Sequence, residues 1–271
     1  MRNQNAEGLA QDAASYLDAV LGVDPGAIGV ILGTGWGDKL LLNNRREISF
    51  HKVPGFGQLS ALEGHSREFV AGSCGGKQVV ALSGRVHLNE APADPMVHQM
   101  CRLQTEALMQ LGVRKLIVTC AAGALPDTGM GIEVGNLVLI NGFLTLFAPD
   151  MPLFAGEFCS PEDALSIRNS DLISSSYAGG TKKGIYAMVR GPFFEGRLCD
   201  KRALSQAGAD IVGMSTLPEA CIASLYGAEV QALAFITNDS EETHDHKTNL
   251  ARATEASEQL ALCLSKIVQA T

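Results

Sequence analysis

The stretch Ile185-Tyr186-Ala187-Met188-Val189-Arg190-Gly191-Pro192-Phe193-Phe194-Glu195-Gly196 joins a short apolar run to a turn with two rings and an acid. The apolar run 185–190 predicts a buried strand. The pair Gly191-Pro192 punctuates that strand and turns the chain. A carboxylate this close to apolar surface is costly unless something hydrogen-bonds to it.

Two interpretations of this turn remain open from these residues alone. A purine ring would offer a face to stack on Phe194 and N–H donors for Glu195. The alternative is an ordinary loop whose Glu points into water, because an acid in a cleft is only a probabilistic marker of a site. The rest of the chain has to decide between them.

Outward from this stretch, apolar runs and helical periodicity alternate along most of the chain. Strands are predicted at 26–32, 67–72, 78–83, 115–125, 136–147, 185–190, 210–216 and 230–236. Helices are predicted at 6–22, 94–111, 161–178, 198–208 and 218–226, with a last helix that ends near Val268. This alternation predicts an α/β fold in which helices cover a twisted, mostly parallel mixed sheet. No repeat or linker interrupts the pattern, so residues 1–271 are expected to form a single domain.

Composition excludes several classes of protein. Apolar residues make up 46% of the 271 residues and charged residues 18%, which is typical of a well-buried globular core. The net charge of -8 argues against binding a nucleic-acid polymer. Seven cysteines without a C-x-x-C pair indicate reduced, buried thiols rather than disulfides or zinc ligands. No apolar run reaches membrane length and no signal peptide is recognisable, so we expect a cytoplasmic protein.

Several predicted strands end in residues suited to binding a ligand. Gly33-Thr34-Gly35 follows the strand 26–32, where glycines let backbone N–H groups approach a ligand. Alternation places Arg85, His87 and Asn89 on one face of an extended segment. An Arg fork beside an imidazole suits a phosphate dianion, although a solvated strand end is the alternative. The strand 115–125 ends in small residues, which leave room for a ligand there.

Three motifs carry a resemblance to a known family. They are Tyr186-Ala-Met-Val-Arg-Gly-Pro-Phe-Phe-Glu195, Gly213-Met-Ser-Thr-Leu-Pro-Glu219 and Ile236-Thr-Asn238. Together they resemble the trimeric purine nucleoside phosphorylase family, whose relatives include methylthioadenosine phosphorylase. The similarity runs from about residue 28 to the last helix.

The resemblance implies a nucleoside phosphorylase-like fold and a pentosyltransferase of purine salvage. Its reaction would be phosphorolysis of purine nucleosides of the inosine and guanosine type to free base and pentose 1-phosphate. Inorganic phosphate would be a co-substrate, and no metal or organic cofactor is implied. The expected assembly is a homotrimer.

The resemblance also implies a role for individual residues. The implied catalytic residues are His87, Glu195 and Asn238. The implied phosphate-binding residues are Thr34, His65, Arg85, His87, Ala121 and Ser215. The implied base-binding residues are Phe194, Glu195 and Asn238. The sugar-binding residues would be Asn89, Met214 and His246, with His244 as the alternative to His246. Phe154, or alternatively Phe158, would reach across the pocket of the neighbouring subunit.

Four departures from the family's pattern bear on the sugar subsite. Asn89 stands where the family usually has a tyrosine that contacts the sugar, and Cys120 stands where its motif has an asparagine. A glycine is replaced at Ser66-Arg67, and Asp239 follows Asn238 in a shortened loop. The sugar preference is therefore left open.

Three other functions remain to be weighed against phosphorolysis. A methylthioadenosine phosphorylase would be expected to face the 6-amino group with an acid rather than Asn238. A nucleosidase that uses water would lack the phosphate-binding set. A non-catalytic purine-binding protein would typically have lost Glu195, Asn238 or Arg85, and all three are present.

Overall fold

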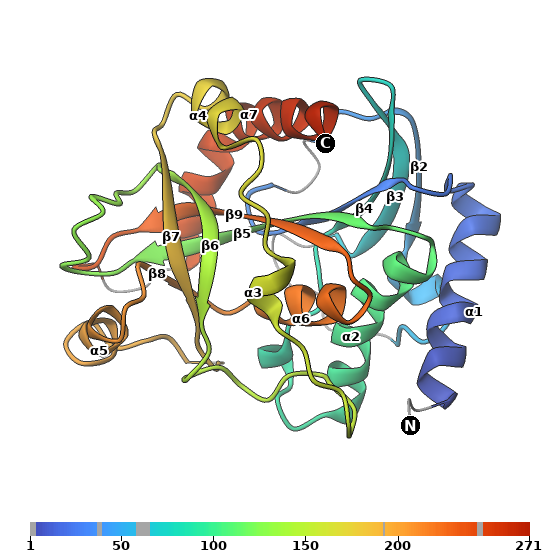
Figure 1. The fold of residues 1–271 in the computed structure, drawn as a ribbon, viewed down its shortest axis with the longest axis horizontal. Coiled ribbons are helices and arrows are strands. Elements are labelled where there is room, and N and C mark those ends of the chain that lie inside the picture. Colours follow the sequence, from blue (N-terminus) through green and yellow to red (C-terminus); the bar gives the residue numbers. More distant parts are fainter. Residues whose placement is uncertain (1–3, 37–39, 58–65, 192, 243–245) are drawn as a thin grey trace.

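The structure is a computed structural model that describes residues 4–36, 40–57, 66–191, 193–242 and 246–271. One nine-stranded mixed sheet runs through these residues (Figure 1). In spatial order its strands are β2 (Asn43–Ser49), β3 (Glu68–Cys74), β4 (Lys77–Ser83), β1 (Ile28–Leu32), β5 (Lys115–Ala124), β8 (Ile211–Gly213), β7 (Thr181–Met188), β6 (Leu137–Leu144) and β9 (Glu229–Asn238). The predicted α/β fold with a mixed sheet is confirmed.

Strand β5 is the centre of the sheet. It pairs in parallel with β1 and with β9, and its last residues pair antiparallel with β8. Because β9 also pairs with β6, the strands β5, β8, β7, β6 and β9 form a closed circuit. The register between β5 and β9 shifts between Ala122 and Gly123, so the closed part of the sheet is irregular where β5 ends.

Helices cover both faces of the sheet, as Figure 1 shows. On one face lie α1 (Gln4–Leu21), α2 (Pro95–Gln110) and α6 (Leu217–Leu225), with the short α3 (Pro161–Ala164) against α6. On the other face lie α7 (His246–Ala270) and α4 (Ser170–Ser176). Alternate strand residues serve the two layers, since Ile31 packs into the core with α1 and α2 while Val30 packs into the core with α7. The helix α5 (Asp200–Gln206) covers β7 and β8.

One local prediction is wrong and one strand was missed. The predicted helix 161–178 is split into α3 and α4, because Leu165 between them bridges to Val230 of β9 and Asn169 turns with φ 60°. The edge strand β2 was not predicted. The pairing of β6 with β7 shifts its register between Ile140 and Gly142.

Within the part of the chain that the structure describes, we found no helix both long enough and apolar enough to span a membrane.

Candidate active site

Segments that follow or end six strands line one cavity of about 470 Å³. Its lining comes from the segments after β1, β4, β7 and β8, from the last residues of β5 and β9, and from Asn249 of α7. Ten residues that the sequence singled out line it together: Thr34, Arg85, His87, Asn89, Ala121, Phe194, Glu195, Met214, Ser215 and Asn238. His65, His244 and the side chain of His246 lie outside the described residues.

Arg85 lines this cavity and is held by two other segments of the chain. The side chain is buried, and its Nη1 donates to Glu219 Oε1 over 2.9 Å while its Nη2 donates to the carbonyl of Thr119. Gly33 permits this placement, because a Cβ there would lie 3.0 Å from Arg85 Nη2 and 2.5 Å from the Thr119 oxygen. The guanidinium is thus fixed in one plane by two elements, which suits bidentate recognition of an anion.

His87 is oriented by Glu90. Its backbone N–H donates to Glu90 Oε1 over 2.8 Å, and its Nδ1 lies 3.3 Å from the same oxygen. Arg67 forms an ion pair with the other carboxylate oxygen. Burial tends to raise the pKa of Glu90, but hydrogen bonds from His87 and the nearby positive charges lower it overall. An ionised Glu90 therefore sets the direction of the imidazole ring.

Alternation predicted that the segment 84–90 is extended, but only part of it is. Gly84 turns the chain with φ 80°, His87 is extended, and a 3₁₀ turn follows at Leu88–Glu90. The three polar side chains still meet at the cavity, but Asn89 reaches it through this turn rather than through strand alternation.

Ser215 sits in a tight turn between β8 and α6. Its backbone N–H donates to the hydroxyl oxygen of Tyr186 over 3.1 Å. Tyr186 is fully buried in β7, and burial raises the pKa of its phenol, so the hydroxyl stays neutral. Thr216 adopts φ 75°, a region that residues other than glycine rarely enter. Such strain often marks a functional turn.

Glu195, Phe194 and Asn238 also line the cavity. Burial raises the pKa of Glu195, while a backbone hydrogen bond and the charge of Lys201 act in the opposite direction. The Phe194 ring is 46% exposed and therefore open to a stacking partner. An acid and an exposed ring meet here, as the purine interpretation of the turn requires.

Asn238 is the last residue of β9 and is 3% exposed. Its Oδ1 lies 3.4 Å from Asn249 Nδ2 of α7 and 3.5 Å from Thr237 Oγ1. Its Nδ2 has no hydrogen-bond partner among the described residues. Buried polar groups are nearly always hydrogen-bonded, so this donor at a cavity wall marks a place for a ligand acceptor.

Asp239, the next residue, turns away from the cavity. Its Oδ1 accepts from the backbone N–H groups of Glu241 at 2.8 Å and Glu242 at 3.0 Å. The carboxylate therefore closes its own loop.

Asn89 and Met214, which also line the cavity, are in contact, with Asn89 Nδ2 3.3 Å from the Met214 sulfur. A Cβ at Gly191 would come within 2.8 Å of Asn89. The same two side chains line a second cavity of about 180 Å³. A tyrosine would fill more of this region than Asn89 does.

Residues 27–269 match the family model described as the phosphorylase superfamily. The chain belongs to this superfamily. It is 33% identical to purine nucleoside phosphorylase of Mycobacterium tuberculosis over 85% of this chain and 82% of that protein. It is 30% identical to purine nucleoside phosphorylase 1 of Bacillus subtilis over 95% of both chains. Among solved structures it resembles isoform 2 of purine nucleoside phosphorylase from Schistosoma mansoni in complex with cytosine and ribose-1-phosphate, with a TM-score of 0.82 and 29% identity over 97% of this chain and 96% of that chain.

Four residues that sequence reasoning did not assign hold the side chains or backbone of cavity residues. Glu219 bonds to Arg85, Glu90 to His87, Tyr186 to the backbone of Ser215, and Asn249 to Asn238. Glu219 could have been noticed in the sequence, because it is an acid within the apolar helix sequence Leu217-Pro-Glu-Ala-Cys-Ile-Ala. A charge in an apolar helix needs a buried partner.

Phe154 does not line the cavity of its own chain. The guanidinium of Arg102 lies 4.1 Å from the centre of its ring, and Arg102 is itself paired with Glu106 and Glu157. The Phe158 ring is 92% exposed.

Proposed function

We propose that this protein catalyses the reversible phosphorolysis of purine nucleosides to free purine base and pentose 1-phosphate. One observation carries the proposal. A single cavity is lined both by Arg85, His87 and Ser215, which we call the anion-facing group, and by Phe194, Glu195 and Asn238. The relatives from Mycobacterium tuberculosis and Bacillus subtilis are purine nucleoside phosphorylases, which supports the same reaction.

Departure of the base is the step in which the purine gains negative charge. The bond between C1′ of the pentose and N9 of the purine breaks, and its electron pair goes to the ring. Asn238 would hydrogen-bond to N7 and O6, and these bonds would strengthen as the charge builds. Glu195 would accept from N1–H of the ring. Its raised pKa predicts that base binding weakens at acidic pH, where the carboxyl takes up a proton.

Phosphate would take up the sugar cation that remains. Arg85, His87, Thr34, Ser215 and the Ala121 backbone N–H would hold it below C1′, where one oxygen forms the new C1′–O bond. We include His65 as a residue that borders this site and His246 as a contact of the 5′-hydroxyl. The proposed chemistry uses no metal or organic cofactor.

The alternative of a methylthioadenosine phosphorylase-like activity is less well supported. It would require an acid toward the 6-position of the base, and Asp239, the nearest acid along the chain, closes its own loop. A non-catalytic binding role is disfavoured by the retention of Arg85, Glu195 and Asn238 in one cavity.

Cellular role and assembly extend this proposal. Relatedness to the superfamily supports a cytoplasmic enzyme of purine salvage that works as a homotrimer. In that assembly an aromatic residue of the loop 148–160, Phe154 or Phe158, would cover the pocket of the next subunit.

The test is release of free hypoxanthine from inosine with and without phosphate. We expect cleavage that requires phosphate, because hydrolysis would need none of the anion-facing group. Arg85→Ala should raise the KM for phosphate much more than the KM for inosine. Equal rates of inosine cleavage in phosphate and phosphate-free buffer would overturn the proposal.

A further inference from the structure

Lys201 is a buried cation away from the anion-facing residues. It lies in α5 and is 1% exposed. Its Nζ donates to the backbone carbonyls of Asp239 at 2.9 Å, Ser240 at 3.3 Å and Glu242 at 3.1 Å. An ammonium has three donors, so all of them can be satisfied by this one loop. A lysine is rarely buried without such compensation.

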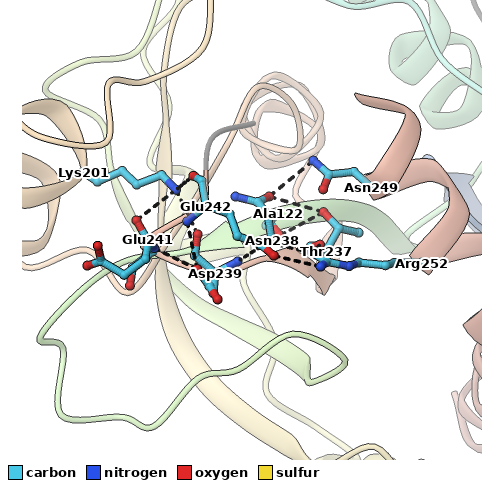
Figure 2. A network of polar contacts seen from close by, with 10 residues as sticks. Ala122, Lys201, Thr237, Asn238, Asp239, Glu241, Glu242, Asn249 and Arg252 are labelled. Carbon is cyan, nitrogen blue, oxygen red and sulfur yellow. Dashed lines mark hydrogen bonds and ion pairs between the residues drawn. The ribbon is translucent and has the colours of Figure 1, made fainter. Parts of the chain in front are cut away.

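The loop that Lys201 binds begins directly after Asn238. Arg252 of α7 holds it from the other side, since its two terminal nitrogens lie 2.7 and 2.8 Å from the Glu242 carboxylate, and its Nη1 also donates to Thr237 O over 2.7 Å. In Figure 2, Lys201 enters from the side of α5 and Arg252 from the side of α7, with the loop between them.

The backbone of Lys201 is bound on the side of Glu195. Its N–H donates to the carbonyl of Gly196 over 3.1 Å. The N–H of Gly196 in turn donates to Asp200 Oδ2 over 2.7 Å, in the same first turn of α5. Lys201 therefore bonds through its backbone to the residue after Glu195 and through its side chain to the residue after Asn238.

We propose that Lys201 is a positioning residue that joins the two base-recognition segments, so that Glu195 and Asn238 keep a fixed spacing across the purine. This inference rests on the base-binding function proposed for those two residues. The two groups would contact opposite edges of one rigid ring, so an error in their spacing weakens both hydrogen bonds at once. Small misplacements of this kind can cost about 100-fold in rate.

Charge provides a second link between Lys201 and the site. Lys201 and Asp200 both lie on α5, and their charges shift the pKa of Glu195 in opposite directions: Lys201 lowers it and Asp200 raises it. Burial lowers the pKa of Lys201, while Glu195, Asp239, Glu242 and Glu241 raise it. Loss of the ammonium should therefore raise the pKa of Glu195.

Lys201→Met tests the proposal, with Arg252→Met as the matched control. Both variants remove a cation that binds the loop 239–242, but only the Lys201 side chain attaches that loop to α5, whose first turn stays bonded to Gly196 through the backbone N–H of residue 201. The first measurement is hydrogen exchange, which does not depend on activity. Lys201→Met should speed exchange in 194–197 and 239–242 together, whereas Arg252→Met should affect only 239–242.

The second measurement is steady-state kinetics over a pH series. Lys201→Met should lower kcat/KM for inosine by about 10- to 100-fold, with the KM for phosphate within about threefold of the parent. The acidic limb of its pH profile, where kcat/KM for inosine falls as the pH is lowered, should move to higher pH, because Glu195 would take up a proton more readily. Lys201→Arg should return this limb to its position in the parent, because it keeps the charge. A role limited to stability would lower the melting temperature without moving this limb.

Each outcome decides between the alternatives. Exchange and kinetics in Lys201→Met that match those of Arg252→Met would overturn the proposal. A parent without phosphorolysis would contradict the proposed function, and the exchange pattern would still decide whether Lys201 joins the two segments. If Lys201→Met does not fold, Lys201→Arg serves in the exchange test, because a guanidinium cannot reproduce the same three bonds.

Discussion

At the scale of single residues, the amide of Asn238 is tightly surrounded. A Cβ at Gly123 would lie 2.7 Å from its Nδ2, so only a glycine there leaves the amide in place. Asn249 and Thr237 contact the Oδ1 side, and Nδ2 has no hydrogen-bond partner in the described part of the chain. In the binding mode that we propose, this donor faces the 6-position of the base.

This geometry predicts a preference for 6-oxopurines. Inosine and guanosine should be good substrates and adenosine a poor one, because adenine presents a donor to the amide N–H and an acceptor to Glu195. A pocket built on hydrogen bonds rejects such a mismatch by about 10⁴-fold or more. Asn238→Asp should narrow the gap, since a carboxyl group can accept from the 6-amino group. The measurement is kcat/KM for inosine and adenosine.

Asp239→Asn is the control for that measurement. Its carboxylate caps its own loop, so we expect the base preference to stay as in the parent. A parent that prefers adenosine, and loses that preference in Asp239→Asn, would show that Asp239 rather than Asn238 reads the base.

At the scale of elements, the start of α6 holds two residues of the cavity. Ser215 lies in the turn that leads from β8 into α6, and Glu219, in the first turn of α6, bonds to Arg85. Both partners of this ion pair are nearly inaccessible to solvent, and they lie 134 residues apart in the chain. The pair thus ties α6 to the segment after β4 and fixes one wall of the cavity.

Glu219→Gln should destabilise the fold and disturb phosphate binding together. Breaking a buried ion pair by removing one charge typically costs about 3–5 kcal/mol, because the other charge stays buried. Denaturant unfolding checks the stability, and the KM for phosphate, expected to change severalfold, checks the site. The control is Glu47→Gln in the half-exposed pair with Arg45, which should cost under about 1 kcal/mol. Loss of stability in Glu219→Gln no greater than in the control would contradict this account.

At the scale of the whole molecule, large apolar side chains remain exposed around the segments that follow β6 and β7. Leu146, Phe147 and Phe193 line one surface pocket and are 77%, 43% and 62% exposed. Phe158 in the loop 148–160 is almost fully exposed, whereas Phe154 is fixed by Arg102. Contiguous exposed apolar surface of this kind often marks a protein interface.

We predict a homotrimer in which these side chains are covered. Three head-to-tail contacts can close into a ring and bring the loop of each chain over the pocket of the next. Light scattering should give three times the chain mass, and Phe158→Ser should raise the KM for inosine more than Phe154→Ser if Phe158 is the ring that crosses over. A fully active monomer would rule the assembly out.

The order of strands and helices, and the residues at the strand ends, could be predicted from the sequence. Buried strands such as β1 and β5 are continuous apolar runs, and ligands bind beyond the carboxyl ends of such strands. Thr34, Arg85, His87, Asn89, Phe194 and Glu195 could be named from the residues themselves, whereas Ala121, Met214, Ser215 and Asn238 were assigned through the family resemblance. The strand β2 was missed because it is an edge strand whose Asn43-Asn44-Arg45-Arg46-Glu47 faces solvent and carries no apolar pattern.

The sequence by itself therefore determined the class of fold, the family and the polar residues at the cavity, since each leaves a local pattern. Only the tertiary structure decided what holds those residues in place. The partners Arg85 and Glu219, and Lys201 and the loop 239–242, are far apart in the chain. Closure of the sheet through β9 and β6 is also a long-range pairing. Such partners come together only in the folded chain, because a buried charge is unfavourable unless it is paired or hydrogen-bonded there.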